Sequence, residues 1–200
     1  MKTYVVKNAP CHRGVLDPAW ENVEKAKIDI CPWKEYPLKP NSSAKLLWSS
    51  GGISVLLESD EKPLVGKETK KNGLVCKDSC MEFFISPKAG DGRYLNIEVN
   101  CLGVMHIGLG EGRGARIHPE FEPSDFRCES YITPSTWRLC YFIPFSFIDS
   151  VFGSHDTDMR GNFYKCGDDT GHEHYVVWNE VSAPAPDYHR PEFFGRITLG

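Results

Sequence analysis

The sequence lacks an excess of positive charge. Its 200 residues contain 23 Lys and Arg against 27 Asp and Glu, which gives a net charge of -4 at pH 7, and its isoelectric point is near 6.0. Lysines gather only in KETKKNG (67–73), where a glutamate and an Asn-Gly pair indicate a solvated loop. A polyanion is bound through clustered Lys and Arg, so we expect no nucleic acid partner.

Long apolar runs are also missing. No stretch approaches the roughly 20 apolar residues of a membrane-spanning helix, and the start, MKTYVVKNAP, has no signal-peptide hydrophobic region. We therefore expect no membrane partner and a soluble, cytoplasmic protein. If a leader has been removed, an extracellular or periplasmic location is expected instead.

No zinc-type CxxC pair occurs among the eight cysteines. Cys76 and Cys80 are four residues apart across an expected strand entry, which is poor geometry for a zinc knuckle or a short disulfide. Cys140 lies in the apolar run WRLCYFIPF, where a free thiol packs as a small hydrophobe. We therefore expect no disulfide in a reducing compartment.

Helical periodicity is scarce, and short strands dominate. A short helix is expected at 20–26, after Asp17-Pro18, and one more turn at 145–152. Apolar segments bounded by Gly, Pro, Asn or Asp predict strands at 3–6, 44–48, 52–58, 81–86, 94–100, 104–109, 127–133, 137–143, 162–166, 175–181 and 196–199. This spacing predicts a single all-β domain over 1–200, an antiparallel β-sandwich of jelly-roll or immunoglobulin-like type with one or two short helices.

The segment RYLNIEVN (93–100) alternates between two kinds of side chain. Period two is typical of a half-buried strand, so Leu95, Ile97 and Val99 are expected in the core. The opposite face offers donors and acceptors suited to sugar hydroxyls, although a merely solvated face is the alternative. We expect that face to be open and concave; it carries Tyr94, Asn96, Glu98 and Asn100.

Two further motifs favour structural roles. GLGEGRG (108–114) resembles a phosphate loop, but IHPEFEP follows instead of a helix, so a glycine-rich loop is expected. His172 and His174 would share one face of an extended strand and could ligate a transition metal, but no third ligand is fixed by spacing. Calcium could bind oxygen ligands nearby, without EF-hand spacing; the candidates are Asp156, Asp158, Asp168 and Asp169.

Carboxylates and aromatics supply the candidate functional residues. Glu82 and Glu98 both alternate against apolar neighbours and, with Asp78, could serve a glycoside hydrolase, although such pairs more often anchor hydroxyls. The C-terminal part is rich in aromatics and amides, the mixture that a sugar site needs. Trp178 is the best candidate for a platform under a sugar ring, and a core tryptophan is the alternative.

Several motifs together resemble the carbohydrate-binding module family 9-like proteins. They are Asp17 to Trp20, LLW (46–48), KDSCMEFFISP (77–87), RYLNIEVNCLG (93–103), NFYKCGD (162–168), Trp178-Asn179 and HRPEFFG (189–195). The resemblance implies a β-sandwich related to the DOMON superfamily, structural calcium, and a saccharide ligand bound without catalysis in the service of polysaccharide or oligosaccharide catabolism. A glycoside hydrolase encoded nearby is an expected partner.

The resemblance also implies roles for individual residues. Two tryptophans would hold a terminal sugar between them, Trp178 matching the second, while Glu82 and either Asn179 or Asn162 would bind its hydroxyls. The first tryptophan should precede Lys77-Asp78, where this chain has Cys76. A cysteine cannot stack on a sugar, so a tyrosine would have to complete the platform. The candidates are Tyr94, Tyr164 and Tyr188.

A haem-binding DOMON-type domain is a further alternative. Met105 and His106 are neighbours on one expected strand and point to opposite faces, so both cannot bind one haem. Met159 or another histidine would have to join one of them.

Overall fold

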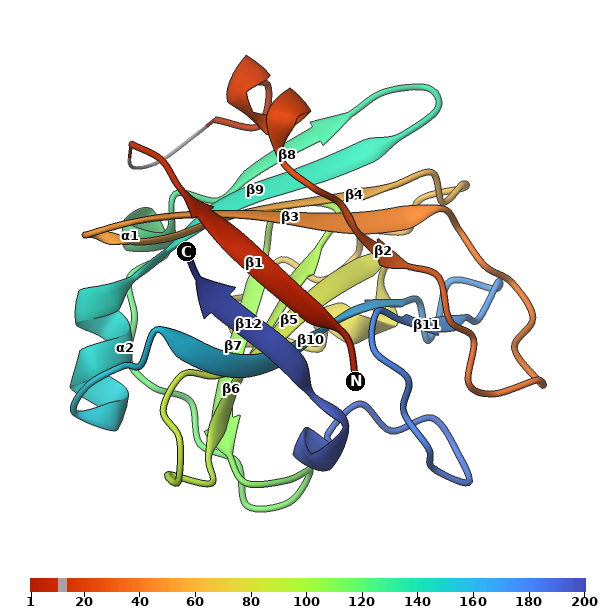
Figure 1. Cartoon of the computed structure of the whole chain (residues 1–200). Helices are drawn as coiled ribbons and strands as arrows, with labels where there is room; N and C mark the ends of the chain where they lie inside the picture. Colours follow the sequence, from red (N-terminus) through yellow and green to blue (C-terminus); the bar gives the residue numbers. More distant parts are fainter. Residues whose placement is uncertain (11–13) are drawn as a thin grey trace.

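The computed structural model describes residues 1–10 and 14–200 (Figure 1). Cys11, one of the expected free thiols, lies outside the described residues. The strands are β1 (Thr3–Asn8), β2 (Ala26–Ile28), β3 (Ser42–Ser49), β4 (Gly52–Ser59), β5 (Cys80–Ser86), β6 (Tyr94–Asn100), β7 (Met105–Gly110), β8 (Glu129–Ile132), β9 (Trp137–Pro144), β10 (Asp158–Cys166), β11 (Tyr175–Val177) and β12 (Gly195–Leu199). The helices are η1 (Pro18–Asn22), η2 (Val75–Lys77), α1 (Pro123–Phe126), α2 (Phe145–Phe152) and η3 (Pro191–Phe193).

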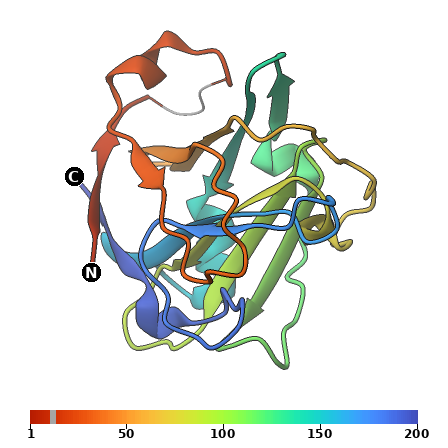
Figure 2. The same cartoon turned by 90° about the vertical axis from the view of Figure 1, so that its right-hand side faces the viewer.

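The strands follow one hydrogen-bonded path that curls over on itself. Its order is β7-β6-β5-β10-β12-β1-β3-β4-β9-β8, with β11 beside β10 and β2 beside β3. The two halves of the path face each other as the layers of a sandwich (Figures 1 and 2). The predicted all-β sandwich is thus confirmed. It departs from a purely antiparallel pattern at β1, which pairs in parallel with both β12 and β3.

The apolar side chains between the layers form the main core. On β6, Leu95, Ile97 and Val99 are fully buried there, as the alternation predicts. Phe83 on β5 and Phe163 on β10 are paired across the strands, and their rings stack with centroids 4.7 Å apart. The polar residues of β5, β6 and β10, with the exception of Lys165, consequently point to the outer face of this layer, where the candidate site lies.

The helices agree with the sequence in one place and differ in another. Helix α2 spans the predicted 145–152. The helix predicted at 20–26 is wrong beyond Asn22, because Val23 is extended and Ala26 already begins β2. Ala26 and Ile28 alternate into the core beside β3, so burial of a period-two pattern outweighs local helix propensity. Within the described residues no helix is long and apolar enough to cross a membrane.

Candidate functional site

Two glutamates form the floor of a cavity on the outer face of β5, β6 and β10. Glu82 and Glu98 are directly opposed across β5 and β6, and they are 3% and 7% exposed. The cavity measures about 150 Å³, which is smaller than the sites that hold drug-sized ligands. Its lining is Cys76, Glu82, Glu98, Arg113, Cys166, Asp168, Tyr175, Pro186, Asp187, Tyr188 and His189.

The polar face of β6 is covered, and the prediction that it is open is wrong. Asn96 is only 1% exposed. The Arg116 guanidinium donates to Asn96 Oδ1 and lies over the ring of Tyr94, 4.5 Å from its centroid. Asn96 Nδ2 in turn donates to Glu98 Oε1 at 2.7 Å. A returning loop therefore closes half of this face and leaves the cavity as its accessible part.

The cavity has an excess of carboxylates. Burial and the neighbouring Glu98 raise the pKa of Glu82 well above its usual range. Burial likewise raises the pKa of Asp168 to about 6, with Glu98 adding to the shift. Arg113 is the one Lys or Arg among the described residues of the lining, and its Nε pairs with Asp187 Oδ1 at 3.0 Å. Burial and the like charge of Glu98 therefore favour the protonated form of Glu82 on this floor.

Tyrosines form the aromatic wall. Tyr175 is partly exposed at the cavity, and its ring meets Tyr36 edge to face with centroids 4.8 Å apart. Tyr188 stacks on Tyr164 at 4.1 Å and 13°, and its hydroxyl donates to the Lys165 carbonyl. These contacts fix both rings in place. Tyr188 is thus the one of the three candidate tyrosines that lines the cavity, while Tyr94 and Tyr164 are fully buried.

Three cysteines lie at the same place. Cys80 and Cys166 are paired across β5 and β10, and the Cys166 thiol donates to Glu82 Oε1 at 3.0 Å. Cys76, on η2, supplies part of the rim at the position expected for a tryptophan platform. Burial raises the pKa of Cys80 to about 12. Cys76, Cys80 and Cys166 are free thiols.

Trp178 does not line this cavity, and its predicted partial exposure is wrong. It is 3% exposed and belongs to the main core. Its ring meets Phe163 edge to face at 5.4 Å. The alternation across Tyr175 to Trp178 left both faces apolar, and the structure turns the indole toward the interior while Tyr175 faces the cavity.

The remaining predicted ligand residues hold the fold together. Asn162 Oδ1 accepts from the backbone amide of Asn179, and Asn162 Nδ2 donates to its carbonyl, which ties β10 to the following loop. Asn179 Nδ2 donates to the Phe193 carbonyl. Asn100 Oδ1 accepts from the amides of Leu102 and Val104 and fixes the turn into β7. Asn100 Nδ2 also donates to the Asp78 carboxylate, and none of the three amides is among the lining residues of the cavity.

The histidines and aspartates predicted as metal ligands do not come together. His172 is exposed, whereas His174 is fully buried with Lys165 Nζ 2.8 Å from its Nε2. The extended geometry predicted for the pair is wrong because β11 begins only at Tyr175. The candidate calcium ligands are also dispersed: Asp158 pairs with Arg196, Asp169 pairs with Lys77, Asp156 accepts from the Ala89 amide, and Asp168 lines the cavity. These four residues do not fit one calcium ion.

Two other predicted motifs are placed as follows. Gly108 and Gly110 belong to β7, and GLGEGRG continues into a turn that carries Arg113 to the cavity, in agreement with a glycine-rich loop. Met105 and Met159 are buried in the main core, and His106 Nδ1 is bonded to backbone carbonyls. The axial ligand set of the haem alternative is therefore not assembled by these residues.

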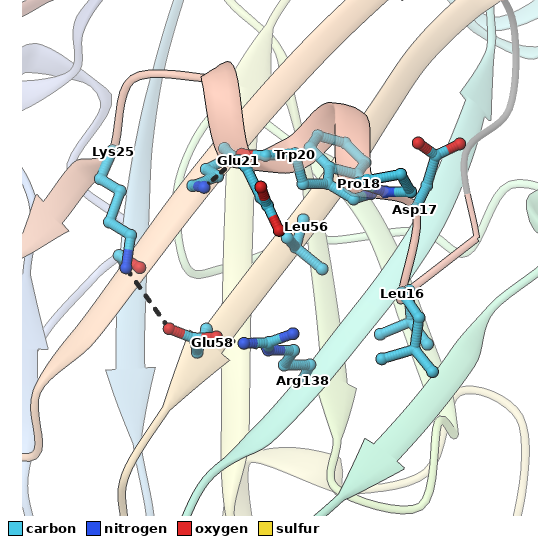
Figure 3. A pocket seen from close by; sticks show the side chains of 12 residues that line it. Leu16, Asp17, Pro18, Trp20, Glu21, Lys25, Leu56, Glu58 and Arg138 are labelled. Atoms are coloured by element: carbon cyan, nitrogen blue, oxygen red, sulfur yellow. Dashed lines mark hydrogen bonds and ion pairs between the residues drawn. The ribbon is translucent and has the colours of Figure 1, made fainter.

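A second hollow, of about 200 Å³, lies on the outer face of the other layer, below η1 (Figure 3). Glu58 at its base is paired with both Arg138 and Lys25. Lys45 donates to the Trp20 carbonyl, and Trp20 itself is buried. Ion pairs of Glu58 with Lys25 and Arg138 occupy the base of this hollow, and we assign the candidate site to the acidic cavity instead.

Sequence reasoning missed Arg113, Tyr175, Asp187 and His189 as lining residues. They come from two segments that are distant in the sequence, the loop 111–118 and the stretch 167–194 that contains β11, and no periodic pattern links these segments. Burial and the nearby Arg116 lower the pKa of His189 to about 3, so its imidazole is neutral and pairs through Nδ1 with the Tyr94 hydroxyl at 2.8 Å. Two features of the sequence could have indicated these lining residues: the arginine in the glycine-rich loop, and the PAPDYHRP segment.

Comparisons with known proteins agree on one family. The model of carbohydrate-binding family 9 matches residues 15–199. A structure from Bacteroides uniformis ATCC 8492, provisionally described as a carbohydrate-binding protein, is 31% identical, with a TM-score of 0.88 over 100% of this chain and 99% of that chain. No curated protein matches the chain.

Two solved structures of a family 9 carbohydrate-binding module from Caldicellulosiruptor kristjanssonii share the fold at 18% identity. The complex with glucose has a TM-score of 0.69 over 100% of this chain and 96% of that chain. The complex with cellotriose has a TM-score of 0.67 over 99% and 93%. On the extent of the family match and the 31% identity, this chain belongs to carbohydrate-binding family 9.

Proposed function

We propose that this protein binds a saccharide, without catalysis, in the acidic cavity on the outer face of β5, β6 and β10. The observation that carries the proposal is the convergence of Glu82, Glu98 and Asp168 beneath a tyrosine wall. Carboxylates accept hydrogen bonds from sugar hydroxyls, and Arg113 supplies donors at the rim. The family 9 module from Caldicellulosiruptor kristjanssonii, crystallised with glucose and with cellotriose, supports a saccharide as the ligand class.

Tyr175 is the aromatic platform in this proposal. Its ring lines the cavity and is held from behind by Tyr36 and, at 6.1 Å and 87°, by Trp33. A sugar packs its C–H face on such a ring, while the hydroxyls at its edge reach the carboxylates. The cavity of about 150 Å³ is below the usual range of drug-sized sites, which favours a single sugar unit.

The placement of the two glutamates favours binding over hydrolysis. A glycoside hydrolase holds two carboxyl groups on either side of the scissile bond. Glu82 and Glu98 are opposed neighbours in one sheet and approach a ligand from the same side. They can accept hydrogen bonds from adjacent hydroxyls on one sugar face. From family membership we further infer a role in polysaccharide or oligosaccharide catabolism, with a glycoside hydrolase encoded nearby as partner.

Calorimetric titration with glucose, cellotriose and a panel of other mono- and oligosaccharides tests the proposal. Tyr175→Ala should weaken binding of the active sugar by about tenfold, since an aromatic contact is worth on the order of 1 kcal/mol. Glu98→Gln should weaken it similarly by exchanging a charged acceptor for an amide.

Tyr131→Ala is the matched control, because Tyr131 is 39% exposed on β8 in the other layer. It should bind as the unchanged protein does. Equal affinity of Tyr175→Ala and Tyr131→Ala would reject the cavity as the binding site. Release of reducing ends from any saccharide of the panel would reject the non-catalytic assignment.

A further inference from the structure

Two thiols and a carboxylate converge on the cavity floor. Cys80 and Cys166 occupy opposed positions on β5 and β10, and Glu82 follows Cys80 by two residues, so all three side chains project from the same face. Their ligand atoms all lie within 4.8 Å of one another, and all three residues are buried. No other group of three or more His, Cys, Asp or Glu side chains this close occurs in residues 1–10 and 14–200.

Glu82 is a buried carboxylate with only a weak partner. It is 3% exposed, and its one hydrogen bond among the described residues is the 3.0 Å contact from the Cys166 thiol. Lys165, which directly precedes Cys166 in the chain, projects from the opposite face of β10 and pairs with Glu61 at 2.8 Å. A buried carboxylate is ordinarily paired with a cation or coordinates a metal. Glu82 therefore offers a buried carboxyl group whose hydrogen-bond partner among the described residues is a thiol and not a cation, as a metal ligand would before the metal binds.

We propose that Cys80, Cys166 and Glu82 form a binding site for Zn²⁺ whose fourth coordination position faces the cavity. Thiolate sulfur and carboxylate oxygen are both zinc ligands. At bonds of about 2.0 to 2.3 Å, tetrahedral ligand atoms are about 3.3 to 3.8 Å apart, so small side-chain rotations bring these three into place. Cys166 and Glu82 line the cavity while Cys80 lies beneath, which leaves the open side toward the cavity.

The binding step is a ligand exchange without redox chemistry. Each thiol gives up its proton to solvent as its sulfur forms a bond to Zn²⁺, and the Glu82 carboxyl likewise releases its proton as one of its oxygens binds the metal. The fourth position is filled by water, or by the thiolate of Cys76 at the rim once that thiol has lost its proton. The site does not depend on a saccharide, although its open position points to where the proposed sugar hydroxyls lie.

Cobalt substitution tests the site in the absence of saccharide. Reduced, metal-free protein titrated with Co²⁺ should take up one equivalent and develop thiolate-to-cobalt charge-transfer absorption with tetrahedral d–d bands. Zn²⁺ should bleach these bands, raise the melting temperature and release protons into a weakly buffered solution. Cys166→Ser and Cys80→Ser should each weaken Co²⁺ binding at least tenfold and reduce the charge-transfer intensity.

Glu82→Gln keeps the shape of the side chain and provides a second test if the cysteine variants fold poorly; it should weaken Co²⁺ binding while the charge-transfer bands remain. Cys140→Ser, a buried cysteine of β9 in the other layer, is the control and should bind as the unchanged protein does. Absent thiolate bands, or bands that survive Cys166→Ser, would overturn the proposal. So would a Cys80–Cys166 disulfide in freshly isolated protein that persists when Zn²⁺ is present. Saccharide titrations with chelator present test the proposed function separately.

Discussion

Glu82 and Glu98 are directly opposed on antiparallel strands, and both side chains line the same cavity. Repulsion by Glu98 helps to raise the pKa of Glu82, and holding that carboxyl protonated costs the folded state free energy at neutral pH, where the unfolded chain ionises it. We therefore expect Glu98→Gln to raise the free energy of unfolding by about 0.5 to 1 kcal/mol at neutral pH while it weakens saccharide binding. The Asn96 amide can still donate to the new side-chain carbonyl. Urea unfolding measures the effect, and a less stable Glu98→Gln protein would contradict the repulsion.

Trp178→Ala should destabilise the fold strongly. The indole packs in the main core against Phe163, so its removal leaves a cavity that costs about 3 to 5 kcal/mol. Trp48→Ala is the comparison, because Trp48 is half-buried and its Nε1 bonds the Gly200 carbonyl at 2.7 Å. Thermal melting should show a much larger drop for Trp178→Ala. Similar melting temperatures for the two variants would contradict the core placement.

Gly108→Ala should disturb the cover of the polar face. A Cβ at Gly108 would stand 2.4 Å from Asn96 Oδ1, the atom that anchors Arg116. Overpacking of this kind costs about 1 to 3 kcal/mol. Gly112→Ala, four residues on in the same glycine-rich segment, meets nothing within 4 Å and should be nearly neutral. Denaturant unfolding measures the stability of both variants. Equal stabilities would contradict the close contact between Gly108 and Asn96.

Two buried histidines should make the fold sensitive to acid. Burial and Lys165 lower the pKa of His174 to about 4, and burial and nearby arginines lower that of His189 to about 3. In the unfolded chain both take up a proton near pH 6.5, so below that pH the unfolded state binds more protons. The free energy of unfolding should therefore fall from about pH 6.5 down to about pH 4, by up to about 1.4 kcal/mol per pH unit for each histidine.

The raised pKa values of Glu82 and Asp168 act in the opposite direction, so variants have to be compared. His189→Gln should flatten the pH dependence of the free energy of unfolding between about pH 7 and about pH 5. His172→Gln, an exposed position, should leave it unchanged. An unaltered slope in His189→Gln would show that this imidazole is not held neutral.

The strands could be predicted because their pattern is local. The alternation of Tyr94 to Asn100 fixes which residues face the core, and β6 spans the predicted residues. What covers the other face is not local: Arg116 comes from a loop after β7, and Tyr188 from the segment before β12. Loops that fold back over a sheet leave no periodic signal in the sequence. The half-closed state of this face could therefore not be predicted.

Local alternation also predicted part of the candidate site. Glu82 and Glu98 could be identified because both alternate against apolar neighbours on adjacent strands, and the structure places both in the cavity. Trp178 could not be resolved, because the residues on both faces of its segment are apolar. The pairing of Cys80 with Cys166 depends on the register of β5 against β10, which spacing along the chain does not reveal.

The position of β1 sets the order in which this protein can be completed during synthesis. Val5 and Val6 pair with Thr198 and Leu199, so during synthesis β1 must wait for β12 before it gains its parallel partner on that side. Closing so long a loop is entropically costly and slow. A nascent chain on the ribosome therefore exposes the edge of β10 until β12 emerges. A stall before Gly195 leaves a partly folded chain that is prone to aggregation.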